Sequence, residues 1–201
     1  KAYNNLGIAL QELGEYRKAI NEYKKAILIV PNSIIVNGLS DLFKSIKLSN
    51  IKKDNSDDLK DLLLFLYKKN NINHDNIFYN SKLLLFLGEN ENQLKQNIHK
   101  NSSLLQNKII KNLLNDKLFL LMLQKSLIAD KFFEKLLTKL RNEILLSLMV
   151  SNKDVLKKYF DFIVSLAEQC FLNEYVYSQC KNEINFINEL KNRIINNKEI
   201  N

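Results

Sequence analysis

KAYNNLGIALQELGEYRKAINEYKKAILIVPN, residues 1–32, is the stretch that decides the fold of this chain. Its pattern mixes large and small residues, and Gly7, Ala19 and Ala26 are small where two helices would approach each other closely. Bulky residues stand between them and can fill the space around such a contact. The stretch therefore predicts two packed helices.

Local signals set the ends of the two expected helices. Gly14 permits a tight turn between a helix over residues 2–13 and a second one over residues 16–29. Pro31 ends the second helix, because proline has no N–H and its ring clashes with the preceding turn. Residues 1–32 are thus expected to form a helical hairpin.

Ten positions of the hairpin fall at the spacings of a tetratricopeptide repeat (TPR), a unit of about 34 residues, and the stretch resembles one nearly complete repeat. These positions are Tyr3, Leu6, Gly7, Leu10, Gly14, Tyr16, Ala19, Tyr23, Ala26 and Pro31. An ordinary helical hairpin with Gly and Ala at its contacts is the alternative. One repeat cannot bury its own apolar face, so the resemblance implies the end of an array whose other repeats precede this chain.

The resemblance also implies a binding surface, because the first helix of each TPR lines a groove that receives extended peptides. The matching positions here are Asn4, Asn5, Ile8, Gln11 and Glu12, together with Lys1. Asn5 stands directly before the Leu-Gly pair and could bond a peptide backbone with both its donor and its acceptor; the alternative is a solvated Asn in an Asn-rich chain. TPR domains that bind chaperone C-termini carry Lys and Asn at the positions of Asn4 and Ile8, so no such binding is expected.

Residues 33–54 are expected to form a degenerate capping helix and a linker. An apolar face persists there, but Leu39 stands one residue early for a second repeat. Such degeneration is typical of the end of a repeat array. The apolar face consists of Ile34, Ile35, Leu39, Leu42 and Phe43.

Residues 55–201 are expected to form a separate, non-repeat helical domain, which makes the fold all-α. Apolar residues recur there at helical spacing and no alternating strand pattern of useful length occurs. Residues 89–99 are polar and carry the weakest helical signal, and residues 70–76 are expected to be a loop. The expected helices are one capped at Asn55 or Ser56, one through Phe78 that stops at Gly88, others at 102–114, 116–128 and 130–150, one opened by a capping box at Ser151–Asp154, and one from Cys180 to Ile194.

No constellation for catalysis, metal binding or a cofactor is found, so the chain is not expected to be an enzyme. His74 and His99 stand in polar stretches and are expected to be exposed, with no nucleophile near them in sequence. Cys170 and Cys180 fall on apolar stripes and are expected to be reduced core residues. The glycines are isolated from one another, whereas a phosphate-binding loop needs several together.

The net charge of +8 does not by itself indicate a nucleic-acid ligand. The only arginines are Arg17, Arg141 and Arg193, whereas base and phosphate recognition favours the planar fork of Arg. No run approaches the roughly 18 consecutive apolar residues of a membrane span. The expected partner is a protein or peptide, the expected location is the cytoplasm, and the missing initiator Met suggests a piece of a longer protein.

Residues 169–177, with the sequence QCFLNEYVY, resemble a segment of bacterial proteins that join an N-terminal TPR array to a class I S-adenosylmethionine-dependent methyltransferase domain. That resemblance implies a catalytic domain beyond residue 201. The alternative is that Phe171, Tyr175 and Val176 are core residues and that Asn173 and Glu174 mark a helix break or a polar contact. Two functions therefore stay open: an interaction scaffold, or the non-catalytic leading part of a TPR-linked methyltransferase.

Overall fold

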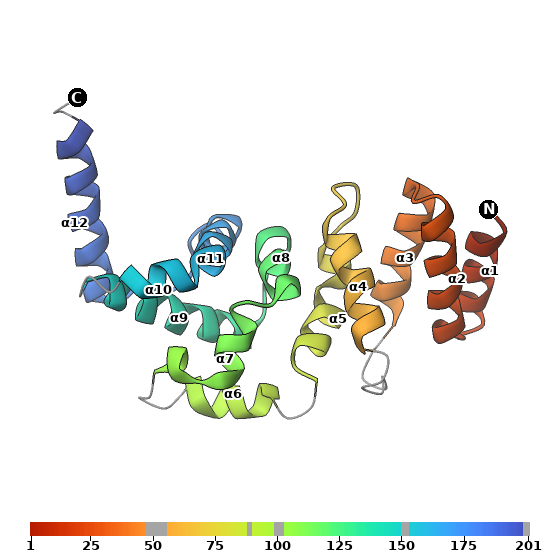
Figure 1. Cartoon of the computed structure of the whole chain (residues 1–201), viewed down its shortest axis with the longest axis horizontal. Coiled ribbons are helices and arrows are strands. Elements are labelled where there is room, and N and C mark those ends of the chain that lie inside the picture. The colour runs from red at the N-terminus through yellow and green to blue at the C-terminus, as the bar shows by residue number, and fades with distance from the viewer. Residues whose placement is uncertain (47–55, 88–89, 99–102, 150–152, 199–201) are drawn as a thin grey trace. The chain divides into compact units, whose positions relative to one another are not determined.

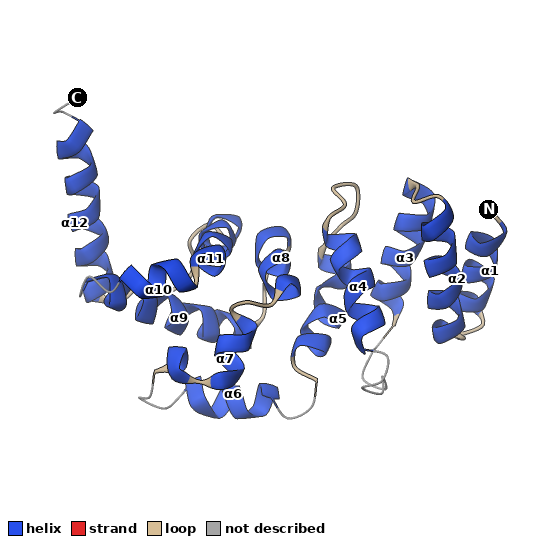
Figure 2. Cartoon of the chain, viewed as in Figure 1, coloured by secondary structure: helices blue, strands red, loops and turns tan. Residues whose placement is uncertain are grey.

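The computed structural model describes residues 1–46, 56–87, 90–98, 103–149 and 153–198, and every regular element in these ranges is a helix (Figures 1 and 2). The expectation of an all-α fold is confirmed. The contacts divide the chain into two compact units. The first comprises Lys1–Glu89 and Lys117–Ser126, and the second comprises Asn90–Asp116 and Leu127–Asn201.

The described residues of the first unit form six helices, which pack both on their neighbours in sequence and on helices further along the chain. α1 packs on α2, α2 on α3, and α3 on α5, while α4 packs on both α5 and α8. The helices are α1 (Ala2–Glu12), α2 (Tyr16–Ile29), α3 (Ser33–Ser45), α4 (Ser56–Tyr67), α5 (Asp75–Leu85) and α8 (Lys117–Lys125).

The hairpin of α1 and α2 forms for the local reasons that the sequence suggests. Gly14 adopts a φ of 75° in the turn between the two helices, a conformation that costs glycine little. α2 ends at Ile29, two residues before Pro31. Asn32 then caps α3, since its Oδ1 accepts a hydrogen bond of 3.0 Å from the backbone N–H of Ile35. The turn after α1, the end of α2 and the start of α3 are therefore each explained by a residue at that position: Gly14, Pro31 and Asn32.

A continuous set of aliphatic and aromatic side chains forms the core of the first unit. Its largest fully buried members are Tyr23, Phe43, Tyr67 and Phe119. Asn80 is buried among them and donates a hydrogen bond to the backbone carbonyl of Phe43, which ties α5 to the end of α3.

In the second unit, α9 contacts most of the other helices. It packs against α6, the 3-10 helix η3, α10 and α12, while α7 contacts η3 and α11 contacts α10. The bounds are α6 (Asn90–Ile98), η3 (Leu104–Gln106), α7 (Lys108–Leu113), α9 (Lys131–Met149), α10 (Lys153–Lys158), α11 (Phe160–Leu172) and α12 (Lys181–Lys198).

Two expected helices are interrupted in the structure. The helix expected over residues 102–114 divides into η3 and α7, because the side chain of Asn107 accepts hydrogen bonds from the N–H groups of Ile109 and Ile110 and starts a new helix. The helix expected after residue 151 divides at Tyr159, whose φ and ψ of −120° and 28° lie outside the helical region.

The polar stretch at residues 89–99 contains the helix α6, in which Leu94 is fully buried. The capping box at Ser151, the helix stop at Gly88, the cap at Asn55 and the exposure of His99 lie outside the described residues. The expected boundary between residues 54 and 55 also falls there, inside the first unit, and that domain division stays a prediction. No helix in the described ranges has the length and apolar character needed to cross a membrane.

Candidate functional site

Tyr23 of α2 is fully buried between two glycines of neighbouring helices. A Cβ atom added to Gly7 of α1 would lie 3.1 Å from Cε2 of the Tyr23 ring. A Cβ atom added to Gly38 of α3 would lie 3.0 Å from Cε1 of the same ring and 3.0 Å from its hydroxyl oxygen. Glycine at both positions lets α1 and α3 approach the ring from its two edges.

The hydroxyl of Tyr23 lies near polar residues of both helices. It donates a hydrogen bond of 3.4 Å to Oε1 of Gln11 on α1. Burial raises the pKa of Tyr23, and the carboxylate of Asp41 on α3 raises it further. α1 and α3 also pack against each other directly, so Gln11 and Asp41 lie on neighbouring helices that both face the Tyr23 hydroxyl.

Each of these two helices also presents a row of exposed side chains. The rows follow the spacing of three or four residues that places side chains on one side of a helix. We name them together the α1/α3 face. It consists of Asn5, Ile8 and Glu12 on α1, and of Asn37, Asp41 and Lys44 on α3, all of them exposed.

The residues expected to bind a peptide differ in their exposure to solvent. Asn5, Ile8 and Glu12 are exposed, as is Lys1, and Gln11 is half-buried at the Tyr23 hydroxyl. Asn4 is only 7% exposed, and its buried Oδ1 has no hydrogen-bond partner in the described part of the chain. Asn4 therefore offers a ligand almost no surface, although it stands beside Asn5 in sequence.

The sequence pattern did not predict that α3 forms part of this face. It predicted no packing role for Gly38 and no binding role for Asp41 or Lys44. The one available signal was Gly38 itself, a helix-weakening residue inside an otherwise helical pattern, which often has a packing reason. The residues expected to shape the repeat include Ala19 and Ala26, which are buried, and Tyr3, Leu6 and Tyr16, which are exposed.

The comparisons with known proteins bear on the hairpin and little beyond it. Residues 1–33 match the tetratricopeptide repeat family model. α1 and α2 are thus a TPR hairpin, and α3 is the next helix after it. No curated protein and no solved structure matches the chain. The resemblance of residues 169–177 to TPR-linked methyltransferases has no support from these comparisons and stays a prediction.

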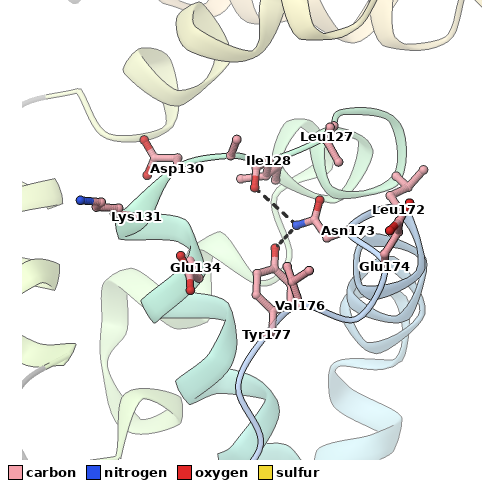
Figure 3. A pocket seen from close by; sticks show the side chains of 11 residues that line it. Leu127, Ile128, Asp130, Lys131, Glu134, Leu172, Asn173, Glu174, Val176 and Tyr177 are labelled. Atoms are coloured by element: carbon pink, nitrogen blue, oxygen red, sulfur yellow. Dashed lines mark hydrogen bonds between the residues drawn. The ribbon is translucent and has the colours of Figure 1, made fainter.

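In the second unit, segment 169–177 comprises the end of α11, which stops at Leu172, and the turn that follows it (Figure 3). Asn173 is buried, and its Nδ2 donates hydrogen bonds to the carbonyl of Ile128 at 3.4 Å and to the hydroxyl of Tyr177 at 2.7 Å. Asn173 thus marks a helix end and a buried polar contact, as the alternative reading expected.

The other half of that alternative, in which Phe171, Tyr175 and Val176 are core residues, is wrong. Their exposed fractions are 69%, 66% and 70%. The physical reason is the backbone after Asn173: Glu174 and Tyr175 adopt φ angles of 51° and 59°, in the left-handed region. This turn carries Tyr175 and Val176 to the surface, whereas Phe171 lies on the exposed side of α11.

Two further expectations are corrected by the structure. Cys180 is exposed, because it precedes α12 and does not lie on the buried side of that helix, whereas Cys170 is buried as expected. His74 is half-buried, and its ring stacks on that of Tyr67 with centroids 5.6 Å apart. Burial lowers the pKa of His74, and its Nε2 has no hydrogen-bond partner in the described residues.

A buried ion pair fixes the chain between α11 and α12 to α9. Nε of Arg141 lies 3.2 Å from Oε1 of Glu183, and the guanidinium also donates to the carbonyls of Tyr177 and Ser178. Burial raises the pKa of Glu183, but hydrogen bonds from the Cys180 N–H and from Arg141 outweigh it and lower that pKa overall. Among the described residues, no group of three or more His, Cys, Asp or Glu side chains is arranged to hold a metal ion.

Proposed function

We propose that this chain is a protein-interaction module, without catalysis of its own, that binds an extended peptide segment at the α1/α3 face. Its TPR hairpin supports the interaction role, because helix-pair repeats of this kind present extended binding surfaces. The observation that carries the proposal is the position of Tyr23, which brings the exposed rows of α1 and α3 together.

The chemistry of the face suits recognition of a peptide backbone. The exposed amide of Asn5 has two donors and an acceptor, and can therefore pair with the C=O and N–H groups of one extended residue. Ile8 adds an exposed apolar contact. Glu12, Asp41 and Lys44 mix the two signs of charge, so this face does not select a strongly charged ligand by long-range attraction.

A nucleic-acid ligand is not part of this proposal. Lysines dominate the basic residues, and the α1/α3 face carries two carboxylates and one ammonium group. Binding to duplex DNA through phosphates would weaken steeply between about 50 and 200 mM salt. We expect no DNA binding to be detected at the lower concentration.

The test begins with a peptide selected on the intact chain from a random phage-displayed library. Its affinity is then measured by fluorescence anisotropy for the wild type, for Asn5→Ala and for Asn21→Ala. Asn21 is an exposed residue of α2, outside the face, and provides a matched control. We expect Asn5→Ala to weaken binding by about 5- to 10-fold, since a lost hydrogen bond costs about 1 kcal/mol, and Asn21→Ala to leave it unchanged.

Circular dichroism should show that both Asn variants stay folded, because both side chains are exposed and Ala is a better helix former than Asn. Equal affinities for the wild type and for Asn5→Ala, with every selected peptide, would show that the α1/α3 face is not the binding site.

A further inference from the structure

A pocket of about 510 Å³ in the second unit lies between the start of α9 and the turn that follows α11 (Figure 3). The buried side chain of Asn173 holds its two walls together, because it bonds both the carbonyl of Ile128, just before α9, and the hydroxyl of Tyr177, after the turn. The fold therefore holds the two walls of the pocket together.

The rim of this pocket is apolar and open to solvent. Leu127, Leu172 and Val176 line it with exposed side chains. Phe171, near the end of α11, and Tyr175, on the turn that follows, extend the apolar surface and pack edge to face with ring centroids 6.5 Å apart. Exposed apolar side chains gathered beside a pocket are typical of interaction sites.

The charge of the lining is opposite to that of the chain. Three carboxylates, of Asp130, Glu134 and Glu174, line the pocket with a single ammonium group, that of Lys131, although the chain has a net charge of +8. Asp130 is already engaged, since its Oδ1 accepts hydrogen bonds from the first N–H groups of α9.

Glu134 and Glu174 are exposed, and neither makes an ion pair within the described ranges. In Figure 3 the side chain of Lys131 extends away from the turn at residues 173–177. The two glutamates are thus available to an external cation, next to an apolar rim that would contact its neighbours.

We propose that this pocket binds a lysine or arginine side chain of a partner protein, with adjacent apolar residues of the partner packing on Leu127, Leu172 and Val176. A basic side chain fits both features, because its aliphatic stem can lie along the apolar rim while its charged end meets one of the two carboxylates, of Glu134 or of Glu174, that lie on either side of the pocket (Figure 3). This site lies in the second unit and is independent of the peptide bound at the α1/α3 face.

The test uses a random peptide library displayed on phage and selected on the intact chain, with the variant Glu134→Gln/Glu174→Gln as a counter-selection. Peptides that bind the wild type and not this variant should share a Lys or Arg next to an apolar residue. One such peptide, synthesised, should bind the variant roughly 2- to 5-fold more weakly, because the variant removes the exposed carboxylate that its basic residue contacts. The same peptide should bind Asn5→Ala as tightly as the wild type.

Two controls separate this proposal from a general effect of charge. Asp161→Asn/Glu168→Gln removes two exposed carboxylates of α11 outside the pocket and should leave the affinity unchanged. Replacing the peptide's Lys with norleucine, which keeps the stem and removes the charge, should weaken binding to the wild type and not to Glu134→Gln/Glu174→Gln.

Val176→Ser should weaken the same peptide by shortening the apolar rim, with the fold intact because Val176 is exposed. The proposal is overturned if the library yields no peptide that distinguishes the wild type from Glu134→Gln/Glu174→Gln. It is equally overturned if the distinguishing peptides lack a basic residue, or if the α11 control variant weakens them as much.

Discussion

Replacing Gly38 with Ala should destabilise the first unit, although the same change in most helices is stabilising. Ala is favoured over Gly in a helix interior by about 1 kcal/mol. Here the new Cβ would lie 3.0 Å from the ring of Tyr23, and the ring has little room to move away, because even a Cβ added to Gly7 on its other edge would lie only 3.1 Å from it. Overpacking of a buried site lowers the free energy of unfolding by about 1–3 kcal/mol. After the gain of about 1 kcal/mol in helix propensity, we expect a net decrease of up to about 2 kcal/mol.

The same substitution should reverse its sign when the ring is absent. In a Tyr23→Leu background no aromatic ring occupies the space between the two glycines, and Gly38→Ala should then stabilise by up to about 1 kcal/mol through helix propensity. The four proteins form a double-mutant cycle with an expected coupling energy of about 1–3 kcal/mol.

Urea unfolding followed by circular dichroism measures the four stabilities, since the chain has no Trp to report by fluorescence. Amide hydrogen exchange of residues 16–29 then assigns the change to α2 and its neighbours. The reasoning is refuted if Gly38→Ala stabilises both backgrounds by the same amount, since the ring would then not be held between α1 and α3.

Three more perturbations have defined outcomes. Asn173→Ala should lower the free energy of unfolding of the second unit by about 1–3 kcal/mol in urea titrations, because it removes two hydrogen bonds of a buried amide; an unchanged midpoint would contradict this role. Burial lowers the pKa of His74 below its ordinary 6.5, so the unfolded chain takes up the proton first on acidification. The stability that neutral His74 contributes is therefore complete above about pH 6.5 and is lost as the pH falls toward the folded-state pKa. The wild type should have a lower urea midpoint at pH 5.5 than at pH 7.5, and this difference should be smaller in His74→Phe. The two proteins would show the same difference if His74 were solvated. Arg141→Met should lower the free energy of unfolding of the second unit by about 3 kcal/mol, because it leaves the Glu183 carboxylate buried without its cation. Adding Glu183→Gln to this variant should restore part of that free energy, measured by the same urea titration.

The TPR hairpin was predictable because each of its signals acts locally. Gly14 allows the turn, Pro31 stops the second helix, and the small residues on α1 and α2 permit a close contact whatever follows them in the chain. The helix α6 was harder to predict, since its sequence is polar. Its one buried residue, Leu94, gains its place through packing against α9, a contact that lies far along the chain.

The candidate site was only partly predictable. Asn5 and Ile8 follow from their positions in the repeat, but the burial of Asn4 and the contact of Gly38 with Tyr23 depend on how α3 is rotated against α2. That rotation is set by the whole apolar face of α3, and no single residue encodes it. It also decides which residues of α3 join the site.

The exposed turn after α11 was not predictable for a different reason. Phe171, Tyr175 and Val176 have the composition of a core. The exposure of Tyr175 and Val176 results from the left-handed backbone at Glu174 and Tyr175, and Phe171 lies on the exposed side of α11. Neither residue is a glycine, the usual sign of such a conformation. One of the two hydrogen bonds of Asn173 that accompany it, to the carbonyl of Ile128, joins segments more than 40 residues apart in sequence.

The central claim is that the TPR hairpin and α3 form one ligand-binding face. Amide hydrogen exchange of the intact chain tests it most directly, measured with and without a saturating selected peptide that still binds Glu134→Gln/Glu174→Gln. We expect slower exchange in α1 and α3 when that peptide is bound. Identical exchange rates in α1 and α3 with and without the peptide would contradict the claim.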